Sequence, residues 1–395
     1  MERPKRSAEG PSLKIGFIYD VIYPYVKGGV EKRVWELARN LAAAGHDVHV
    51  FGMRFWHGPA VIQREGVHLH GVCRPMPLYT KSGRRSIRQA FGYALRLAPR
   101  LVRERFDVLD CQALSYPACL VAGSIGRVKR IPVVMSWHEV WTEYWLDYLG
   151  WLGHFGRLIE LGCARLTRHH IAGSAEAARK LQSSFGIEPL ALIPNGIDVE
   201  SVDLIAAGTS PQDVLYVGRL IREKNLELLI EATSRLRDGG LRPSVLVVGD
   251  GPDRPRLEAA AAARGLDNIR FAGFLDRDEE VLALMKSSKV LALPSLREGF
   301  GIVVLEANAC GVPVVTVDHP GNAARLLVQD GKTGLVTRAD AGDLARALAV
   351  CLADEPRRRA MADEARQAGR SLAWKAISAE LASVYAGLVG EARAA

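Results

Sequence analysis

The stretch PSLREGFGIVVLEANACGVPVV occupies residues 294–315 and has the pattern of a turn, a helix and a strand. An apolar run ends at Leu293, the turn that follows holds Glu298 and two glycines, and a helix is predicted from there to about Cys310. Glycine lets the backbone approach a ligand closely, and the amides at a helix N-terminus suit phosphate. The stretch therefore predicts a strand, an anion-binding turn and a helix in succession.

A second glutamate, Glu306, lies in the otherwise apolar run 302–309. A carboxylate among apolar residues is costly unless it binds something, and a pair of sugar hydroxyls would satisfy it. The residues alone leave an alternative open, in which Glu298 is a solvated loop charge and Glu306 a salt-bridged surface residue.

Short apolar runs alternate with longer runs of helical period along the whole chain, which is typical of stacked βαβ units. A chain of 395 residues exceeds what one hydrophobic core usually supports, so we expect two α/β domains with parallel sheets. The predicted strands occupy residues 13–19, 47–52, 108–111, 132–136 and 169–172 in the first half, and 214–217, 244–248, 269–272, 290–293, 312–317 and 335–336 in the second.

The composition is that of an ordinary globular protein, with 48% apolar and 24% charged residues. The net charge of +8 favours anionic partners, among which charge alone cannot choose. The six cysteines form no Cys-x-x-Cys pair, which indicates reduced thiols rather than disulfides or a zinc site. The N-terminal residues lack an export signal, and the most apolar segment, 146–166, holds too many charges to span a bilayer. These features predict a cytoplasmic protein.

Two cations follow the predicted strand 214–217. Arg219 comes directly after it, and Lys224 lies near the start of the next helix. A cation at a helix N-terminus is unfavourable unless an anion lies nearby. A guanidinium and an ammonium group that converge on a diphosphate would neutralise the charge that develops on a leaving group. The alternative is a pair of exposed basic residues.

His138 follows the predicted strand 132–136, at the kind of edge where open α/β sheets bind ligands. Trp137, Trp141 and Trp145 would share one face if this segment is helical. Such aromatic stripes are usually core, but this one could also line a groove for the face of a sugar or a prenyl chain.

Two glycine loops follow other predicted strands. Gly28 and Gly29 come after the first strand, and Gly249 and Gly251 come after the strand 244–248. Neither loop has the Gly-x-Gly-x-x-Gly spacing of a dinucleotide fingerprint, which argues against a nicotinamide enzyme. Both could be plain turns.

The sequence Asp276-Arg-Asp278 has the form of a metal-binding Asp-x-Asp motif. It lies at the start of a predicted helix over residues 279–286, where acidic residues cap the helix and complement its dipole. We interpret it as a cap, and we expect no metal site.

Residues 81–105 hold eight basic residues and one acid. On a helical wheel most of the arginines fall on one side, and we expect the apolar set opposite them (Ile87, Phe91, Leu95, Ala98 and Val102) to face the core. The basic face is either solvated or docks on anionic lipid headgroups, and Pro99 would kink such a helix. The residues assigned to the acceptor or the membrane are Arg84, Arg85, Arg88, Trp137 and Trp141.

These separated motifs together resemble the retaining GT-B glycosyltransferases with a Glu-x7-Glu motif, a group that includes bacterial mannosyltransferases and sucrose-synthase-like enzymes. The resemblance runs from about Leu13 to Leu388. It implies two Rossmann-like domains that face across a cleft. The implied boundaries are an acceptor domain over residues 1–198, a linker over 199–212, a nucleotide-sugar domain over 213–371, and a C-terminal helix over 372–395 that returns to the first domain.

The resemblance also implies a reaction: transfer of a sugar from a nucleoside diphosphate to an acceptor hydroxyl, with retention and without a required metal or cofactor. The acceptor would be a saccharide, a lipid-linked molecule or a small molecule, and nucleic acid is not expected as a partner. The implied catalytic residues are His138, Arg219, Lys224 and Glu298. The implied donor-binding residues are Gly28, Gly29, Arg219, Lys224, Gly249, Gly251, Glu298, Gly299, Phe300, Gly301, Ile302 and Glu306.

In this family Glu298 would contact the sugar, Glu306 the ribose, and the amides from Phe300 to Ile302 the sugar and diphosphate. We expect a front-face route, in which a donor phosphate oxygen helps to deprotonate the acceptor. Two alternatives stay open: a nucleotide-sugar epimerase of the same fold, and a non-catalytic nucleotide-sugar-binding subunit. The location would be cytoplasmic, either free or peripheral on the inner face of the membrane.

Overall fold

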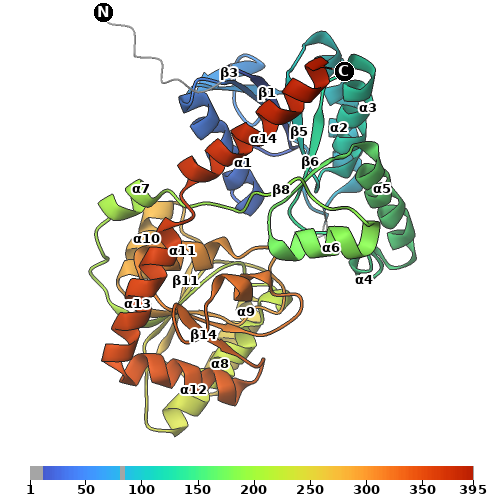
Figure 1. Ribbon diagram of the computed structural model, residues 1–395. Coiled ribbons are helices and arrows are strands. Elements are labelled where there is room, and N and C mark those ends of the chain that lie inside the picture. Colours follow the sequence, from blue (N-terminus) through green and yellow to red (C-terminus); the bar gives the residue numbers. More distant parts are fainter. Residues whose placement is uncertain (1–11, 81–84, 395) are drawn as a thin grey trace, which may run out of the picture. The chain divides into compact units, whose positions relative to one another are not determined.

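The computed structural model describes residues 12–80 and 85–394. They form two compact units, each built on a parallel sheet (Figure 1). The first unit contains the described residues up to Pro194 together with helix α14 (Trp374–Ala394), and the second runs from Asn195 to Ala373. The predicted α/β class with parallel sheets is confirmed in both units.

The sheet of the first unit has eight strands in the order β3-β4-β2-β1-β5-β6-β7-β8. Every pair of neighbours is parallel except β3 and β4, which form an antiparallel hairpin at one edge. The strands are β1 (Lys14–Ile18), β2 (Asp47–Gly52), β3 (Val61–Arg64), β4 (Val67–Gly71), β5 (Val108–Gln112), β6 (Val133–Trp137), β7 (His169–Ala172) and β8 (Ala191–Leu192).

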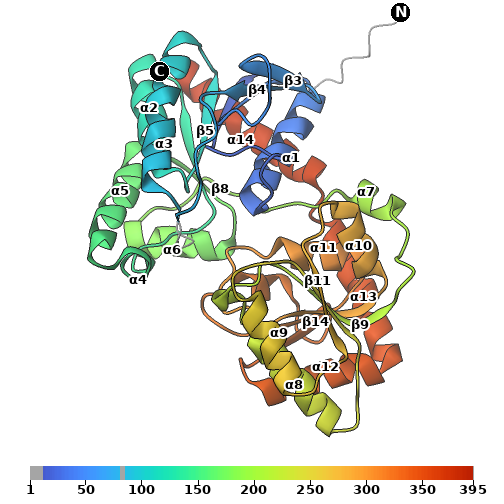
Figure 2. The same cartoon turned by 180° about the vertical axis from the view of Figure 1, so that it is seen from behind.

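Helices cover this sheet. Helix α1 packs against α14, α2 packs against α3, and α3 also packs against α5 (Figure 2). Because α14 comes from the other end of the chain, segments far apart in the sequence lie side by side in this unit. The helices are α1 (Gly29–Ala43), α2 (Ile87–Arg103), α3 (Tyr116–Lys129), α4 (Tyr144–Leu149), η1 (Gly150–Leu152), α5 (Gly153–Leu166), α6 (Ala175–Phe185) and α14.

The sheet of the second unit has six parallel strands in the order β11-β10-β9-β12-β13-β14. The strands are β9 (Gln212–Val217), β10 (Val245–Val248), β11 (Ile269–Gly273), β12 (Ser288–Leu293), β13 (Val314–Val317) and β14 (Gly334–Thr337). The helices are α7 (Val199–Leu204), η2 (Arg222–Lys224), α8 (Leu226–Asp238), α9 (Arg254–Ala263), α10 (Asp278–Lys286), α11 (Ile302–Cys310), η3 (Ala323–Leu327), α12 (Ala341–Ala353) and α13 (Glu355–Arg370).

The predicted linker over residues 199–212 is helical in its first half. Residues Val199–Leu204 form helix α7, because the Asp198 carboxylate accepts a hydrogen bond from the Ser201 amide at 3.1 Å and so caps the first turn. The Lys286 ammonium donates to two carbonyls at the end of the same helix. The segment is thus packed onto the second unit.

Helix α14 is fixed to the first unit by its buried face and by polar contacts. Trp374, Ile377, Leu381 and Tyr385 are all buried, at the helical spacing seen in the sequence. The Tyr385 hydroxyl donates to Asp110 on β5 at 2.5 Å. This helix therefore completes a core whose other parts come from the first half of the chain.

The strand order places one switch point in each sheet. In the second unit β9 and β12 are neighbours, and the chain leaves them toward opposite edges of the sheet. In the first unit β1 and β5 are neighbours in the same way. Open α/β sheets bind ligands at the carboxyl ends of the strands at such a point, so these two places are where site residues are sought.

Candidate functional site

The switch point of the second unit joins two charged residues from separate loops. Lys224 ends the 3₁₀ turn η2 after β9, and Glu298 lies in the turn after β12. The Lys224 ammonium and a Glu298 carboxylate oxygen lie 2.6 Å apart, with side chains 20% and 12% exposed. The structure therefore brings two of the predicted catalytic residues into direct contact while leaving both accessible.

Backbone hydrogen bonds hold these two loops together. The Leu296 amide donates to the Glu223 carbonyl at 2.9 Å, and the Lys224 side-chain ammonium donates to the Arg297 carbonyl oxygen at 3.4 Å. The Glu298 amide donates to the Gly321 carbonyl at 3.0 Å. The Glu298 carbonyl also accepts from the Ala323 amide at 2.9 Å, so hydrogen bonds fix the backbone that carries the Glu298 carboxylate.

Arg219 lies at an exposed position two residues after β9. Its carbonyl accepts a hydrogen bond from the Tyr216 hydroxyl at 3.2 Å. Burial, and to a smaller extent the Glu298 charge, raises the pKa of that hydroxyl far above its ordinary value, so it stays a neutral donor. The carbonyl contact fixes the backbone of Arg219 at the carboxyl end of β9, the strand that also leads to Lys224.

The turn before α11 requires glycine. Gly301 has φ +95°, and a Cβ there would lie 2.3 Å from the Ala324 Cβ. Because Gly301 offers no side chain as a cap, the first amides of α11 keep no side-chain partner from that position. Gly299, Phe300 and Ile302 are half-buried beside it, and so is Glu306 one turn into the helix.

The loop after β10 requires glycine for the same kind of reason. Gly249 has φ +131°, and a Cβ there would lie 1.9 Å from the Gly218 carbonyl oxygen. A Cβ on Gly251 would lie 2.3 Å from the Leu220 carbonyl oxygen. These contacts pack the loop after β10 against the loop that carries Arg219, so the two glycines are explained by close backbone approach.

In the first unit a buried hydrogen-bond network leads to His138. The His138 Nε2 lies 2.8 Å from the Gln112 amide oxygen, and the Gln112 amide nitrogen donates to Asp110 at 2.6 Å. Asp110 also accepts hydrogen bonds from Ser136 at 3.0 Å and from Tyr385. The carboxylate at the centre of the network is fully buried and has three donors from the protein.

The network determines how the imidazole is presented. Burial raises the pKa of Asp110, and the three donors and the Arg33 charge oppose that rise. Burial, helped by Arg33, lowers the pKa of His138 to about 3, so the ring is neutral. Since Gln112 donates through its nitrogen to Asp110, its oxygen must accept from His138 Nε2. His138 therefore holds its proton on Nε2 and leaves Nδ1 as a hydrogen-bond acceptor.

The Gly28–Gly29 loop precedes α1 at the carboxyl end of β1. A Cβ on Gly28 would lie 2.4 Å from a Glu31 carboxylate oxygen, so the missing side chain lets Glu31 fold back over the start of α1. Burial raises the pKa of Glu31. In the structure the half-buried Glu31 carboxylate therefore lies beside this loop, a feature that was not predicted from the sequence.

Trp137 does not line a groove, which corrects one expectation. It lies on strand β6, is fully buried, and its indole N–H donates to His170 at 3.0 Å. The three tryptophans also share no helix face, because α4 begins only at Tyr144. Trp141 is half-buried and packs on Trp145 with 4.7 Å between ring centroids.

The basic residues assigned to acceptor or membrane separate into three cases. Arg84 lies outside the described residues. Arg85 forms an ion pair with the buried Asp20 at 2.8 Å, so its charge is used within the unit. Arg88 is exposed on α2.

The core face of α2 was also assigned wrongly. The buried residues are Gln89, Tyr93, Ala94, Leu97 and Leu101. Four of the five apolar residues expected there are exposed, with Leu95 72% and Val102 59% accessible, and they lie beside exposed arginines, while Ala98 is half-buried. Helix α2 thus has two apolar faces, and the buried one includes Gln89, whose amide is satisfied by donating to Asp20 at 2.8 Å.

Several polar residues of the first unit were missed. Asp110 and Glu160 are fully buried carboxylates in apolar runs. Glu160 accepts hydrogen bonds from the Trp141 and Thr142 amides at 2.8 and 2.9 Å, which fixes the loop after His138. Both are charged residues in an apolar run, which is the sequence signal from which Glu306 was predicted as a site residue.

The Asp-x-Asp segment precedes and begins α10. Asp276 and Arg277 are exposed, and Arg277 pairs with Glu280 one turn later. Asp278, Glu279 and Glu280 form an acidic first turn, although residue 277 provides no side-chain cap. Among residues 12–80 and 85–394, the groups with metal-binding spacing all lie in the first unit. In the same residues no helix is both long and apolar enough to cross a membrane.

Comparison with known families gives two matches that together cover most of the chain. The family model described as "Glycosyl transferases group 1" matches residues 205–368. The model described as "Glycosyltransferase Family 4" matches residues 27–201. Each match falls within one of the two structural units or crosses its border by a few residues.

Characterised relatives and solved structures agree with these matches. The chain is 30% identical over 389 residues to a glycogen synthase of Mycobacterium tuberculosis, covering 92% of both chains. It is 29% identical to a phosphatidyl-myo-inositol mannosyltransferase of Mycobacterium leprae, covering 94% of this chain and 96% of the relative.

Among solved structures, sucrose-phosphate synthase from Thermosynechococcus elongatus superposes with a TM-score of 0.77 at 21% identity, covering 95% of this chain and 99% of that one. Anabaena Alr3699/HepE, solved with UDP and glucose, superposes with a TM-score of 0.73 at 20% identity, covering 94% and 98%. The two parallel α/β units and the full-length sequence match lead to one conclusion: the chain belongs to the group 1 family of glycosyltransferases with the GT-B fold.

Proposed function

We propose that this chain is a retaining glycosyltransferase that moves a sugar from a nucleoside-diphosphate donor to an acceptor hydroxyl. The observation that carries the proposal is the Lys224–Glu298 pair, 2.6 Å apart and accessible at the switch point of the second unit. A cation there suits a diphosphate, and a carboxylate there suits sugar hydroxyls. The pair sits beside the N-terminus of α11, whose amides favour an anion.

The donor roles follow from where the residues lie. Glu298 would accept hydrogen bonds from sugar hydroxyls, and Glu306, half-buried on α11, would accept them from the ribose. The amides of Phe300 to Ile302 would approach the phosphates. The UDP bound in Alr3699/HepE supports a nucleotide ligand for this fold.

The chemistry we propose is a front-face displacement. Lys224 and Arg219 hold the leaving diphosphate and neutralise its growing charge. A phosphate oxygen of the donor takes the proton from the acceptor hydroxyl, which then forms the new glycosidic bond on the face that the diphosphate leaves. Glu298 keeps Lys224 in place before the donor binds, because the two groups are already in contact.

His138 would act on the sugar as an acceptor. Its ring is neutral, Nε2 is committed to Gln112, and Nδ1 is available to a hydroxyl. The chain Tyr385–Asp110–Gln112 fixes this orientation from behind. His138 is therefore proposed to orient the sugar and not to shuttle a proton near neutral pH.

The acceptor is proposed to be a saccharide or a lipid-linked molecule, as the names of the relatives suggest. The exposed apolar residues Phe91, Leu95 and Val102 on α2, beside exposed Arg88 and Arg96, favour docking of the first unit on an anionic lipid surface. Sedimentation with phosphatidylglycerol vesicles tests this. We expect salt-sensitive binding that Leu95→Asp abolishes, and equal binding by wild type and variant would contradict it.

The donor assignment is tested by thermal unfolding with a panel of nucleoside diphosphates and their sugars. A ligand that binds the folded state raises the unfolding midpoint by mass action. We expect one nucleoside diphosphate to stabilise the wild type, and its 2′-deoxy analogue to stabilise it less. In Glu306→Gln the two ligands should stabilise equally, since the ribose contact is already lost. A full difference in the variant would show that Glu306 does not contact the ribose, and no stabilisation by any member of the panel would contradict the donor class.

A further inference from the structure

A cluster of polar side chains lies on one face of the first unit's sheet, and all its members except His70 lie in the amino-terminal halves of β2 and β4. Asp47 and His49 point to this face from β2, and His68 and His70 point to it from β4. His49 and His68 are direct cross-strand partners, and their rings stack with centroids 4.8 Å apart. The sugar-transfer proposal does not use any of these residues.

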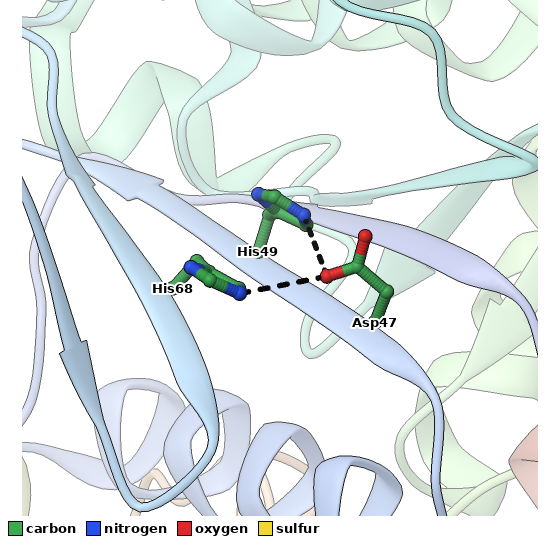
Figure 3. Close-up of side chains that lie close together, drawn as sticks. All are labelled: Asp47, His49 and His68. Carbon is green, nitrogen blue, oxygen red and sulfur yellow. Dashed lines mark hydrogen bonds and ion pairs between the residues drawn. The ribbon is translucent and has the colours of Figure 1, made fainter.

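The geometry points both imidazoles at one carboxylate oxygen. Figure 3 shows His49 and His68 with their Nε2 atoms directed at Asp47. The distances to the Asp47 Oδ1 are 3.0 Å from His49 and 3.6 Å from His68. The second distance is too long for a good hydrogen bond. Among the described residues, Asp47 is the one polar partner of the His68 ring.

A shared metal ion accounts for both separations, whereas a hydrogen bond accounts only for the 3.0 Å contact between His49 and Asp47. Metal–nitrogen bonds of about 2.0–2.1 Å at tetrahedral angles separate neighbouring ligand atoms by about 3.3 Å. The two observed separations lie on either side of this value, and the three ligand atoms all lie within 4.8 Å of one another. We propose that Asp47, His49 and His68 bind a divalent transition-metal ion of the zinc class.

His70 and Glu104 form the support that such a site needs. The His49 Nδ1 lies 2.7 Å from the His70 Nε2, which is a hydrogen-bond distance and too short for two ligands of one tetrahedral ion. The His70 Nδ1 lies 3.8 Å from Glu104, whose other oxygen pairs with Lys14 at 3.3 Å. Metal-binding histidines commonly donate their second nitrogen to such a partner, which fixes the tautomer with the free lone pair on the metal.

The donor set selects the class of ion. Two imidazole nitrogens and one carboxylate oxygen suit zinc, and also nickel or copper, rather than calcium or magnesium. The Asp47 and His68 side chains are 45% and 36% exposed, so an ion could enter and a water molecule could fill the fourth position. The ion would link β2 to β4, which is one of the two strands of the edge hairpin β3–β4.

The site lies away from the proposed transfer chemistry, because it is at the amino ends of the strands. The assigned residues of the first unit follow the carboxyl ends of β1 and β6. The ion is therefore expected to affect the stability of the first unit and not the turnover number. Removal of metal by a chelator should lower the unfolding midpoint of the wild type, and added zinc should restore it.

The experiment uses the full chain without a histidine tag, freed of metal by a chelator. Zinc affinity is measured by competition with a chromogenic chelator, and the ligand field by visible absorption with cobalt in place of zinc. We expect one equivalent bound by the wild type. Asp47→Ala/His68→Ala should lose at least about 100-fold in affinity, and His70→Phe about 10- to 100-fold. The phenyl ring should be tolerated at position 70, since His70 stacks on Phe51 at 4.4 Å.

The matched controls are His57→Ala and His154→Ala, which remove exposed histidines outside the cluster. Both should bind zinc as the wild type does. Unchanged affinity in Asp47→Ala/His68→Ala would overturn the proposal, as would a cobalt spectrum with a sulfur charge-transfer band, which would assign the ion to a cysteine. A wild type that binds no stoichiometric metal would show that the cluster is held by hydrogen bonds alone. The metal-free unfolding midpoint of each variant shows that it is folded.

Discussion

The two units share one strand order around the switch point but use their charged residues differently. In the first unit Asp20, two residues after β1, and Asp110, within β5, are each 1% exposed and hydrogen-bonded to side chains of the same unit. In the second unit Lys224 and Glu298 follow β9 and β12 and remain accessible. The topology therefore places charged residues near the carboxyl ends of the strands in both sheets, but their burial decides which charges a ligand can reach. Substitutions should cost turnover in the second unit and folding stability in the first.

The largest effect is expected from Glu298→Ala. Loss of the carboxylate removes a proposed sugar contact and leaves Lys224 without its partner, so kcat/KM should fall about 1,000-fold, or about 4 kcal/mol. Release of nucleoside diphosphate measures the rate. Glu223→Gln, an exposed carboxylate in the neighbouring loop, is the control and should keep full activity. Normal turnover in Glu298→Ala would remove the role assigned to it.

Lys224→Ala should lower kcat about 10- to 100-fold, because the leaving diphosphate loses one positive charge. The free energy of unfolding should change by about 1 kcal/mol or less, as for other accessible ion pairs. The matched control is Lys289→Ala, which breaks an exposed pair with Asp213 in the same sheet and should leave kcat unchanged. Equal effects of the two variants on kcat would contradict the role assigned to Lys224 in the second unit.

Tyr385→Phe tests the first unit. It removes one of the donors to buried Asp110 without changing the ring, so the free energy of unfolding should fall by about 1–3 kcal/mol. Urea denaturation measures this change. The exposed Tyr25→Phe should be neutral. A Tyr385→Phe protein as stable as the wild type would mean that the buried network contributes little to folding.

The smallest effect is expected in the pH dependence set by His138, the partly accessible exception in the first unit. Its pKa is about 3 when folded and near 6.5 when unfolded. The unfolded state therefore binds more protons between these values, and stability falls as the pH drops below 6.5. His138→Gln should reduce that loss of stability by about 1 kcal/mol between pH 7 and pH 5.5. Urea denaturation at both pH values measures it, and His57→Gln, at an exposed position, should keep the wild-type slope.

Much of the sheet architecture could be predicted from the sequence. The predicted strands 47–52 and 169–172 have the bounds of β2 and β7, and α11 ends at Cys310 as expected. Strands of a parallel sheet are buried on both faces and read as continuous apolar runs. The hairpin β3–β4 was missed, since β3 is mostly exposed and lacks such a run.

The errors arose where periodicity cannot tell one apolar face from another. Helix α2 has two apolar stripes, and the one that packs on the sheet includes polar Gln89, which its bond to Asp20 satisfies. Trp137 was grouped with two other tryptophans on one face of a possible helix, although it is the last residue of strand β6. In the site, the residue types of Lys224 and Glu298 were predicted, but their contact depends on the pairing of β9 with β12, which no local pattern contains.

Helix α14 has a consequence for the order in which the protein can fold. The second unit is one continuous segment, whereas the first is completed by residues from 374 onward. During synthesis the second unit can therefore close while Asp110 still lacks the hydroxyl of Tyr385. Until α14 emerges, the apolar side of α1 that it covers stays open to water. In a chain that ends before residue 374, the second unit should therefore resist protease, whereas the first unit should be cleaved.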